Sequence, residues 1–238
     1  LQNQYIQLDL GPIKLAGNLE GWDNLYTLSS VEDYQDRYDS TFAIEPSLLK
    51  TIQLAPLRQE QIKSIEVGYR GIVRQKLFID VSGYYSLYAH FIGEVRVVQP
   101  LHGAVAGQES GENALLTNSS SNQTYQVYQI PTNASQNVSS YGGTIALAYY
   151  VGKGISATAN YTLAILDTTG LKDPIVPGFN TPKHKFNIGI TGRNVWKGLG
   201  FSTNFKWVDG FYWQSSFGDG AVPSYHLLDA QVSYEVTA

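Results

Sequence analysis

Strict alternation of apolar and polar residues over 154–167 (GISATANYTLAILD) is the feature that most constrains the fold of this chain. Consecutive side chains of a β-strand point to opposite faces, so the alternation predicts a strand with one apolar and one polar face. The apolar positions are Ile155, Ala157, Ala159, Tyr161, Leu163 and Ile165, and the opposite positions are Ser156, Thr158, Asn160, Thr162 and Ala164. The polar face carries no charge, and the segment is far longer than the usual strand of about 5–6 residues.

Six further segments alternate in the same way, and the connections between the segments are alternately short and long. The segments are 62–74, 76–95, 141–151, 185–192, 199–213 and 227–236. The short connections lie near 74–76, 152–154 and 194–198, and the long ones at 96–139, 167–183 and 214–224. Outer-membrane β-barrels combine short periplasmic turns with long extracellular loops. The pattern therefore predicts regular transmembrane β-hairpins over 62–238 with three long extracellular loops.

The first part of the chain, 1–61, is less regular. A hairpin is expected around Gly11 and Pro12, because glycine and proline favour turns. Residues 30–57 mix acidic residues, tyrosines and prolines, which predicts a structured loop with a helical turn near Pro46–Lys50. We therefore expect 1–61 to form an N-terminal hairpin and an extracellular-loop region of the barrel.

Composition supports a surface that is not mainly exposed to water. Charged residues make up 15% of the chain, against about 25% in soluble domains. Aromatic residues fall near both ends of the predicted strands, as in the two aromatic girdles of a membrane barrel. They are Tyr149, Tyr150 and Trp196 near short turns, and Tyr84, Tyr85, Tyr88, Phe211, Tyr212 and Trp213 beside long loops. The alternative is a soluble sandwich, in which tyrosine and tryptophan are simply favoured strand residues.

The segment LAPLRQEQIKSIEVGYRGIVRQKLFIDVSGYYSLYAHFIGEV (54–95) resembles a stretch found in the barrels of TonB-dependent outer-membrane receptors. The resemblance is strongest to the Bacteroidetes type that carries a carboxypeptidase-regulatory-like domain. Residues 9–49 are similar to the same group, and 180–192, 200–214 and 222–236 resemble late strands of such barrels. The resemblance implies a barrel of about 22 strands around a plug, with a TonB box that contacts the inner-membrane energy complex.

Seven to nine predicted strands cannot close a barrel of that size. We therefore expect an all-β, antiparallel portion of a larger transmembrane barrel, from the C-terminal part of the receptor. A separate eight-stranded barrel is the alternative, but the seven alternating segments give an odd count, and bacterial single-chain barrels have even counts.

The resemblance implies transport of a bulky solute, such as an oligosaccharide, a peptide or a metal chelate, across the bacterial outer membrane. The implied partners are outer-membrane lipid and the TonB complex, the latter through parts outside this chain. No enzymatic activity and no cofactor are expected. The alternative function is a structural barrel subunit that docks surface lipoproteins, and a soluble β-barrel that binds a ligand is a third hypothesis.

No pattern predicts a catalytic or metal site. The chain has no cysteine, no G-x-S-x-G and no P-loop spacing. The four histidines, His90, His102, His184 and His226, lack metal-ligand spacing. We expect His90 and His184 to be polar strand-end residues near the outer rim.

Charged residues on the predicted polar strand faces are the remaining candidates. They are Glu66, Arg70, Asp80, Lys185, Lys206, Asp229 and Glu235. The expected role is cross-strand pairing, and contact with a plug or solute is the alternative. The polar segment 107–140 could close over a ligand or dock a lipoprotein, or have no dedicated role. The sequence does not identify residues that contact ligand or partner.

Overall fold

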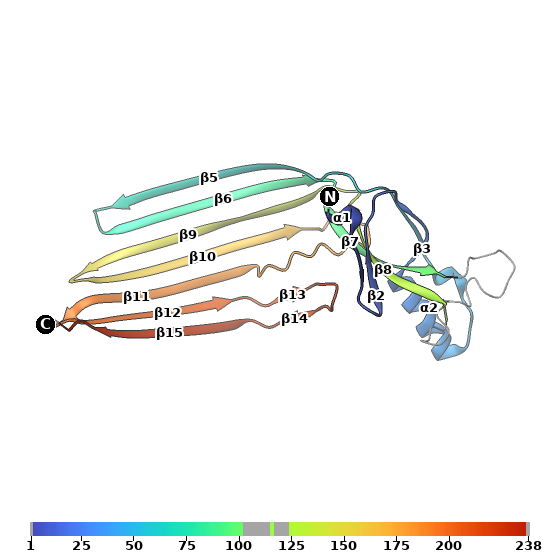
Figure 1. Ribbon diagram of the computed structural model, residues 1–238. Helices are drawn as coiled ribbons and strands as arrows, with labels where there is room; N and C mark the ends of the chain where they lie inside the picture. Colours follow the sequence, from blue (N-terminus) through green and yellow to red (C-terminus); the bar gives the residue numbers. More distant parts are fainter. Residues whose placement is uncertain (1, 102–114, 117–123, 237–238) are drawn as a thin grey trace.

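A computed structural model describes residues 2–101, 115–116 and 124–236 and shows one long β-sheet with a shorter, curled sheet at one end (Figure 1). The long sheet, here called the wall sheet, has seven strands in the order β15-β12-β11-β10-β9-β6-β5, and every neighbouring pair is antiparallel. Its strands are β5 (Gln61–Val73), β6 (Leu77–Ala89), β9 (Val138–Gly152), β10 (Ile155–Asp167), β11 (His184–Trp196), β12 (Leu199–Val208) and β15 (Tyr225–Tyr234). Each overlaps one predicted alternating segment, so the predicted all-β antiparallel class is confirmed. The segments 76–95 and 199–213 are too long, because the chain bends after β6 and after β12 before the next strand begins.

Tight turns join the wall strands at one end of the sheet, as the alternation of short and long connections predicts (Figure 1). The β9–β10 turn uses Lys153 and Gly154, with φ of 50° and 76°, and the β11–β12 turn uses Lys197 and Gly198, with φ of 46° and 86°. Two consecutive residues with positive φ match the twist of a two-residue hairpin turn. The long connections lie at the opposite end of the sheet.

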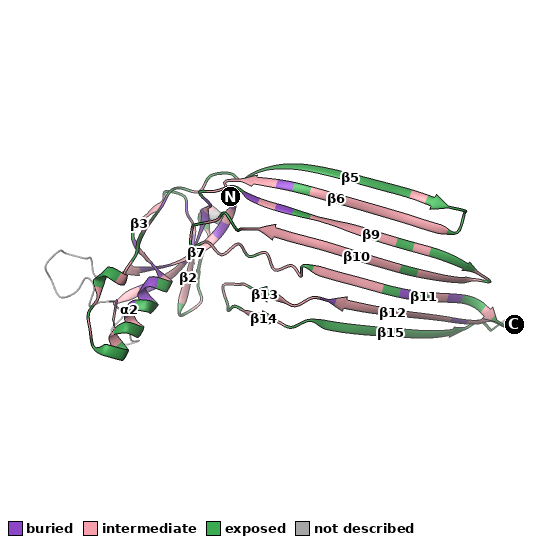
Figure 2. Ribbon diagram, turned by 180° about the vertical axis from the view of Figure 1, so that it is seen from behind, coloured by how far each residue is buried: buried purple, intermediate pink, exposed green. Residues whose placement is uncertain are grey.

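The strand register sorts side chains into an apolar and a polar face that continue across the whole wall sheet. One row of the apolar face is Gly71, Ile79, Leu147, Ala159, Ile188, Phe205 and Leu228. The neighbouring row of the polar face is Arg70, Asp80, Ala146, Asn160, Asn187, Lys206 and Leu227. Large apolar side chains stay exposed in the sheet interior; Ile188, with neighbours on both sides, is 55% exposed. Burial colours along the wall strands are mostly exposed and intermediate (Figure 2).

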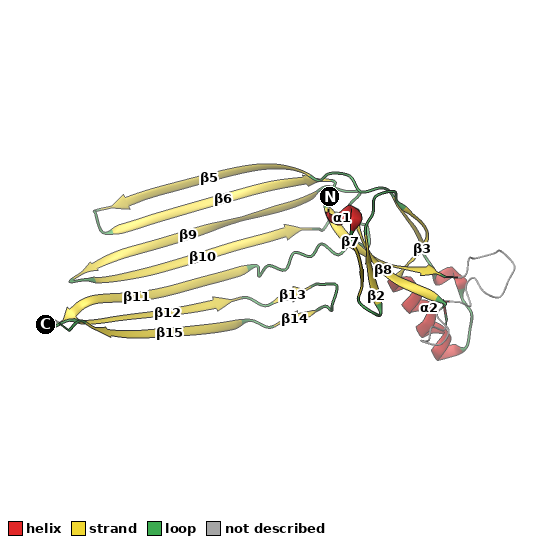
Figure 3. Cartoon of the chain, in the orientation of Figure 1, coloured by secondary structure: helices red, strands yellow, loops and turns green. Residues whose placement is uncertain are grey.

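The curled sheet, here called the cap sheet, has six strands in the order β1-β2-β8-β7-β3-β4 and lies at the long-connection end of the wall sheet (Figure 3). Its strands are β1 (Gln7–Asp9), β2 (Ile13–Ala16), β3 (Trp22–Thr27), β4 (Thr51–Leu54), β7 (Ile92–Pro100) and β8 (Tyr125–Asn133). All pairs are antiparallel except β2 and β8, which run parallel. The expected hairpin around Gly11 and Pro12 is confirmed as β1–β2.

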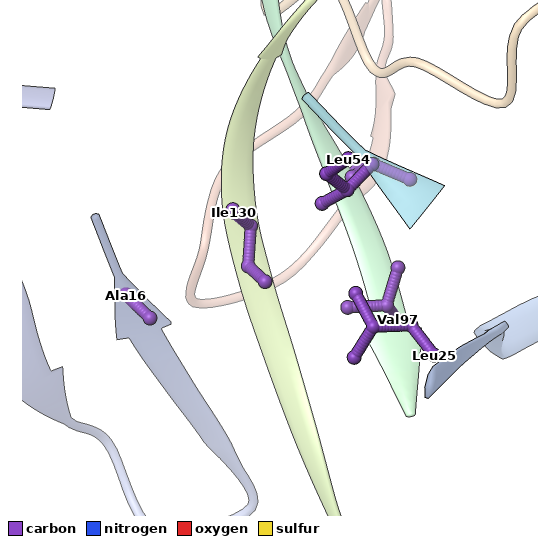
Figure 4. Close-up of a cluster of buried hydrophobic side chains, with 6 residues drawn as sticks. Ala16, Leu25, Leu54, Val97 and Ile130 are labelled. Carbon is purple, nitrogen blue, oxygen red and sulfur yellow. The ribbon is translucent and has the colours of Figure 1, made fainter. Parts of the chain in front are cut away.

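The cap sheet holds the principal apolar core of the described residues. Ala16, Leu25, Leu54, Val97 and Ile130 come from five strands and form one buried cluster (Figure 4). Helix α2 (Leu28–Thr41) packs on the other face, where Val31 and Tyr34 bury against Val98 and Leu115. The remaining elements are α1 (Gln2–Tyr5), the 3-10 turn η1 (Pro46–Leu48) and a hairpin of β13 (Phe211–Trp213) and β14 (Gly220–Val222).

Two local predictions are wrong. The segment 30–57 is not mainly a loop, because residues 28–41 form α2; its apolar side chains Leu28, Val31 and Tyr34 recur at the spacing of one helix face. The helical turn predicted near Pro46–Lys50 is confirmed as η1. The range 96–139 is not a simple loop either. Most of β7 and all of β8 lie within it, because their apolar side chains pair and bury in the cap sheet. Residues 102–114 and 117–123, within or beside the predicted polar segment 107–140, lie outside the described residues.

Candidate functional site

Polar side chains from distant parts of the chain meet where the β13–β14 hairpin touches the cap sheet. We call this group the junction, and its members are Glu94 and Arg96 of β7, Gln129 of β8, and Ser215, Ser216 and Asp219 of the hairpin loop. Arg96 and Gln129 stand directly opposite each other in the β7–β8 register. Strand alternation places Glu94, Arg96 and Val98 on one face, so α2 covers one half of that face and the hairpin contacts the other.

Arg96 is the centre of the junction. Its Nη1 donates to Asp219 Oδ2 at 2.8 Å and its Nη2 to Asp219 Oδ1 at 3.0 Å, which is the two-pronged geometry of a strong arginine–carboxylate pair. Nη2 also donates to the carbonyl of Ser215 at 2.9 Å, and Nε to Gln129 Oε1 at 3.3 Å. The two charged side chains are only 23% and 20% exposed. The hydrogen bond from Arg96 holds the pKa of Asp219 below its ordinary value, and the amide of Ser215 adds to this effect.

Gln129 extends the junction to the neighbouring groups. Its Nε2 donates to Ser216 Oγ at 2.9 Å and to the Glu94 carboxylate. The junction therefore places one guanidinium, two carboxylates, an amide and hydroxyl groups within hydrogen-bonding reach of one another. Such a group can bind polar atoms of a solute or a neighbouring loop, but it contains no nucleophile–base pair of the kind that covalent catalysis needs.

The connection between β10 and β11 meets the same region. Glu94 and Val176 form a β-bridge, with N···O distances of 3.0 and 2.7 Å. Asn180 then bonds both backbone groups of Gln214 at 2.8 Å, which ties this connection to the one that carries the hairpin. The three long connections thus converge on the β7–β8 strands.

The polar face of the wall sheet contains short cross-strand hydrogen bonds. Asn187 donates to Asn160 at 2.7 Å. Of the predicted charged candidates, Arg70 and Asp80 pair across β5 and β6 at 2.6 Å, which confirms cross-strand pairing for these two. The other candidates take part in no ion pair among the described residues, and their register partners are uncharged: Glu66 faces Tyr84, Lys185 faces Val208, Lys206 faces Leu227 and Asp229 faces Asn204, while Glu235 follows β15.

The histidines do not come together. His184 begins β11 at the long-connection end, as predicted, and its Nδ1 shares a hydrogen bond with the Tyr161 hydroxyl at 2.7 Å. His90 lies in the tight bend after β6, and His226 stacks on Phe205. His102 falls outside the described residues. Across the described part of the chain, no group of three or more His, Cys, Asp or Glu side chains is placed to hold a metal ion.

Several predicted girdle positions are exposed at the expected ends of the wall strands. Trp196 is 67% exposed at the tight-turn end, and Tyr85 is exposed near the long-connection end. Tyr88 differs, because its ring packs edge-on against Phe91 at 5.8 Å in a small core beneath the loops. Within the part of the chain that the structure describes, no helix has the length and apolar character needed to cross a bilayer.

Sequence reasoning missed the junction entirely. Arg96 and Asp219 are far apart in sequence, and each stands in a segment predicted as loop. The available signal was weak: Glu94 and Arg96 alternate with Val95 and Val97, which indicates a strand with a polar patch on one face.

Comparison with known proteins gives one family match. The family described as "TonB dependent receptor-like, beta-barrel" matches residues 23–238. No curated protein matches the chain.

Solved structures provide distant likenesses. They include "Copper transporter OprC" (13% identity, TM-score 0.49), which covers 76% of this chain and 24% of that one. A second is an FrpB iron transporter from Neisseria meningitidis (10% identity, TM-score 0.48), for which the match covers 76% of this chain and 24% of the transporter. A third is P. aeruginosa FpvA bound to a pyoverdine–iron complex (14% identity, TM-score 0.48), for which the match covers 77% of this chain and 22% of FpvA. The chain thus spans about a quarter of the length of these structures.

Proposed function

The chain belongs to the TonB-dependent receptor-like β-barrel family, and we propose that it forms part of the barrel wall and extracellular face of a receptor that imports a bulky solute. Barrels of this family reside in the bacterial outer membrane, and so does this chain. The family consists of transport proteins rather than enzymes. The proposal therefore assigns the chain a role in passage and recognition and no catalytic chemistry.

The observation that carries this proposal is the separation of apolar and polar faces across the wall sheet. In a membrane barrel, outward side chains contact lipid and inward side chains contact a wet lumen. The Ile79–Leu147–Ala159–Ile188 row suits lipid contact. The hydrogen-bonded polar face suits a lumen through which a hydrated solute or a plug can slide.

The three long connections and the cap sheet are assigned to the extracellular side. The division is 1–61 as the N-terminal hairpin and loop region, and 62–238 as the transmembrane hairpins with outward connections at 96–139, 167–183 and 214–224. The junction lies among these outward segments, so its donors and acceptors are positioned to meet a solute before it reaches the lumen. A surface lipoprotein that docks on the cap sheet is the further partner consistent with this placement.

The proposed solute is an oligosaccharide, a peptide or a metal chelate. Energy is supplied by TonB, through a plug and TonB box assigned to other parts of the receptor. Outer-membrane lipid surrounds the apolar face of the wall. A structural barrel subunit would share the wall but would move no solute.

Uptake by cells tests this function directly. Cells that lack the receptor gene are compared with cells that carry it, each with and without a functional TonB complex, for uptake of labelled oligosaccharides, peptides, and iron and copper chelates. We expect one solute class to enter only when both receptor and TonB are present. Equal uptake of every class in all four strains would contradict a transport role and favour the structural subunit.

A further inference from the structure

We propose that the cap sheet is a hinged lid and that the Arg96–Asp219 ion pair is its latch. This inference rests on the proposed placement of the cap sheet at the extracellular mouth. It goes beyond the transport role by naming the part that moves and the contact that holds it. The cap sheet is attached in different ways to the two sides of the wall sheet.

The covalent attachments of the cap sheet all lie on one side of the wall. The segment 55–60 links β4 to β5, residues 90–91 link β6 to β7, and 134–137 link β8 to β9. Strands β5, β6 and β9 are consecutive neighbours at one edge of the wall sheet. Three short linkers lie side by side and form a hinge line, about which the cap sheet can turn without loss of strand pairing. Phe91 and Ala134 of two linkers pack in one small apolar core and turn together.

Asn133 holds these linkers together at the hinge. Its Oδ1 accepts from the Arg58 amide at 2.6 Å, and its Nδ2 donates to the carbonyls of Arg58 at 3.0 Å and His90 at 2.8 Å. One side chain therefore ties the end of β8 to the linkers that precede β5 and β7. This side of the cap sheet is fixed both covalently and by hydrogen bonds.

The opposite side of the wall reaches the cap sheet through the junction. The β13–β14 hairpin lies between β12 and β15 in the chain, and these strands form the other edge of the wall sheet. The hairpin contacts the cap sheet through polar groups, with Arg96 and Gln129 donating hydrogen bonds to Ser215, Ser216 and Asp219. If the Arg96–Asp219 pair separates, the hairpin loses its ion pair to the lid, while the hinge and the Glu94–Val176 bridge to the β10–β11 connection stay intact.

One half of this cap-sheet face is covered by α2 and the other half by the β13–β14 hairpin, and the two coverings differ in how readily they separate from the sheet. Helix α2 is held by buried apolar side chains such as Val31 and Tyr34, which lose favourable burial when they are exposed to water. The hairpin is held by polar groups, which can exchange protein partners for water at a small net cost. The hairpin side is therefore the one that opens.

The test measures access to the lumen and needs neither a solute nor TonB. Thr162, on the polar face of β10, is changed to Cys in the full receptor as a reporter. Intact cells are treated with a membrane-impermeant fluorescent maleimide, and the labelling rate is recorded. In R96D and in the isosteric D219N, we expect labelling roughly fivefold faster than in the T162C parent, the change that about 1 kcal/mol produces in a two-state equilibrium.

Two further variants separate the latch from general damage. The exchange R96D/D219R restores the pair and should return labelling to the parental rate. The matched control is R37Q, which breaks the more exposed Arg37–Glu45 pair, at 2.9 Å, between α2 and the segment that follows it. This variant should leave the labelling rate unchanged. All variants are first compared for folded barrel by their resistance to unfolding in SDS without boiling.

Each result decides the lid proposal. Faster labelling in R96D and D219N with rescue by the exchange supports the latch. Unchanged labelling in D219N, or acceleration in R37Q equal to that in R96D, overturns it. Because labelling does not depend on transport, a receptor that imports no tested solute can still show the latch, and a transporting receptor can still lack it.

Discussion

The ring of Phe201 lies over Gly192, its register partner on the neighbouring wall strand, in the space that a side chain at position 192 would need. A Cβ at Gly192 would stand 2.5 Å from Phe201 Cε1 and 2.6 Å from Val195 Cγ1. An aromatic ring that covers a glycine on the adjacent strand shields exposed backbone and helps to fix register. The pair thus links a sequence choice at one strand to the position of the next.

Gly192→Ala should weaken the barrel, because the added methyl group forces the Phe201 ring out of place. Overpacking of this kind costs about 1–3 kcal/mol. The readout is the temperature at which the receptor loses its compact band in unboiled SDS gels. Gly170→Ala is the matched control, since a Cβ there meets nothing within 4 Å. Equal melting of both variants would show that the ring can move aside freely.

Leu147→Arg and Ala146→Arg should differ strongly although the two residues are adjacent in β9. Leu147 lies on the apolar face and Ala146 on the polar face. An arginine on the lipid side of a barrel costs about 2–4 kcal/mol at mid-membrane, whereas a lumen substitution is tolerated. The amount of folded receptor in outer membranes measures the difference. A greater loss for Ala146→Arg would mean that the two faces have been assigned the wrong way round.

Acid should loosen the hairpin from the cap sheet. The Arg96 hydrogen bond lowers the folded-state pKa of Asp219, so the stabilisation is complete above the unfolded-state pKa of about 3.9. This stabilisation is lost as the pH falls through the folded-state pKa of Asp219, which is lower still. Protease cleavage within 209–224 should stay slow at neutral pH and accelerate only below about pH 4. Asp219→Asn should show fast cleavage at every pH, and a persistent acid step in that variant would assign the effect to another group.

Asn18→Ala should destabilise the cap sheet without affecting the wall sheet. Asn18 is fully buried, and its amide donates to the carbonyls of Ala55 at 2.9 Å and Pro131 at 3.1 Å. Removing the side chain loses both hydrogen bonds, at a cost of about 1–3 kcal/mol that is partly offset because the buried Asn18 Oδ1 has no partner. Hydrogen exchange of the backbone amides in β3, β4 and β8 gives the readout. The exposed Gln53→Ala serves as control, and identical exchange in both variants would show that the amide contributes nothing to closure of the curled sheet.

The wall sheet could be predicted from sequence because its signal is local. In each strand, apolar and polar residues alternate over ten or more residues. The face on which a residue such as Ile155 or Tyr161 lies therefore follows from its position in the alternation. The tight turns are equally local, since Gly154 and Gly198 supply the positive φ that such turns require. Register then follows from matching apolar faces across neighbours.

The cap sheet and the junction could not be predicted in the same way. Strands β7 and β8 are short and buried on both faces in places, and β8 pairs with β2 more than a hundred residues away. The acidic residues of α2 obscure its helical pattern in the sequence, although Leu28, Val31 and Tyr34 follow a helical spacing. The Arg96–Asp219 pair depends on two connections, 96–139 and 214–224, that meet in space, and no local sequence pattern indicates that.

The parallel pairing of β2 with β8 determines the order in which the cap sheet can assemble. Ile13 is the register partner of Val127. The β1–β2 hairpin therefore cannot pair with the sheet until β8, more than a hundred residues later in the sequence, has reached its position. Contacts that span so much sequence form slowly, because the loop must be closed before they gain any energy. The beginning of this chain is therefore expected to dock last. A receptor arrested during insertion would display β1–β2 as a loose arm beside an unfinished cap sheet, open to capture by antibodies that cannot bind the finished protein.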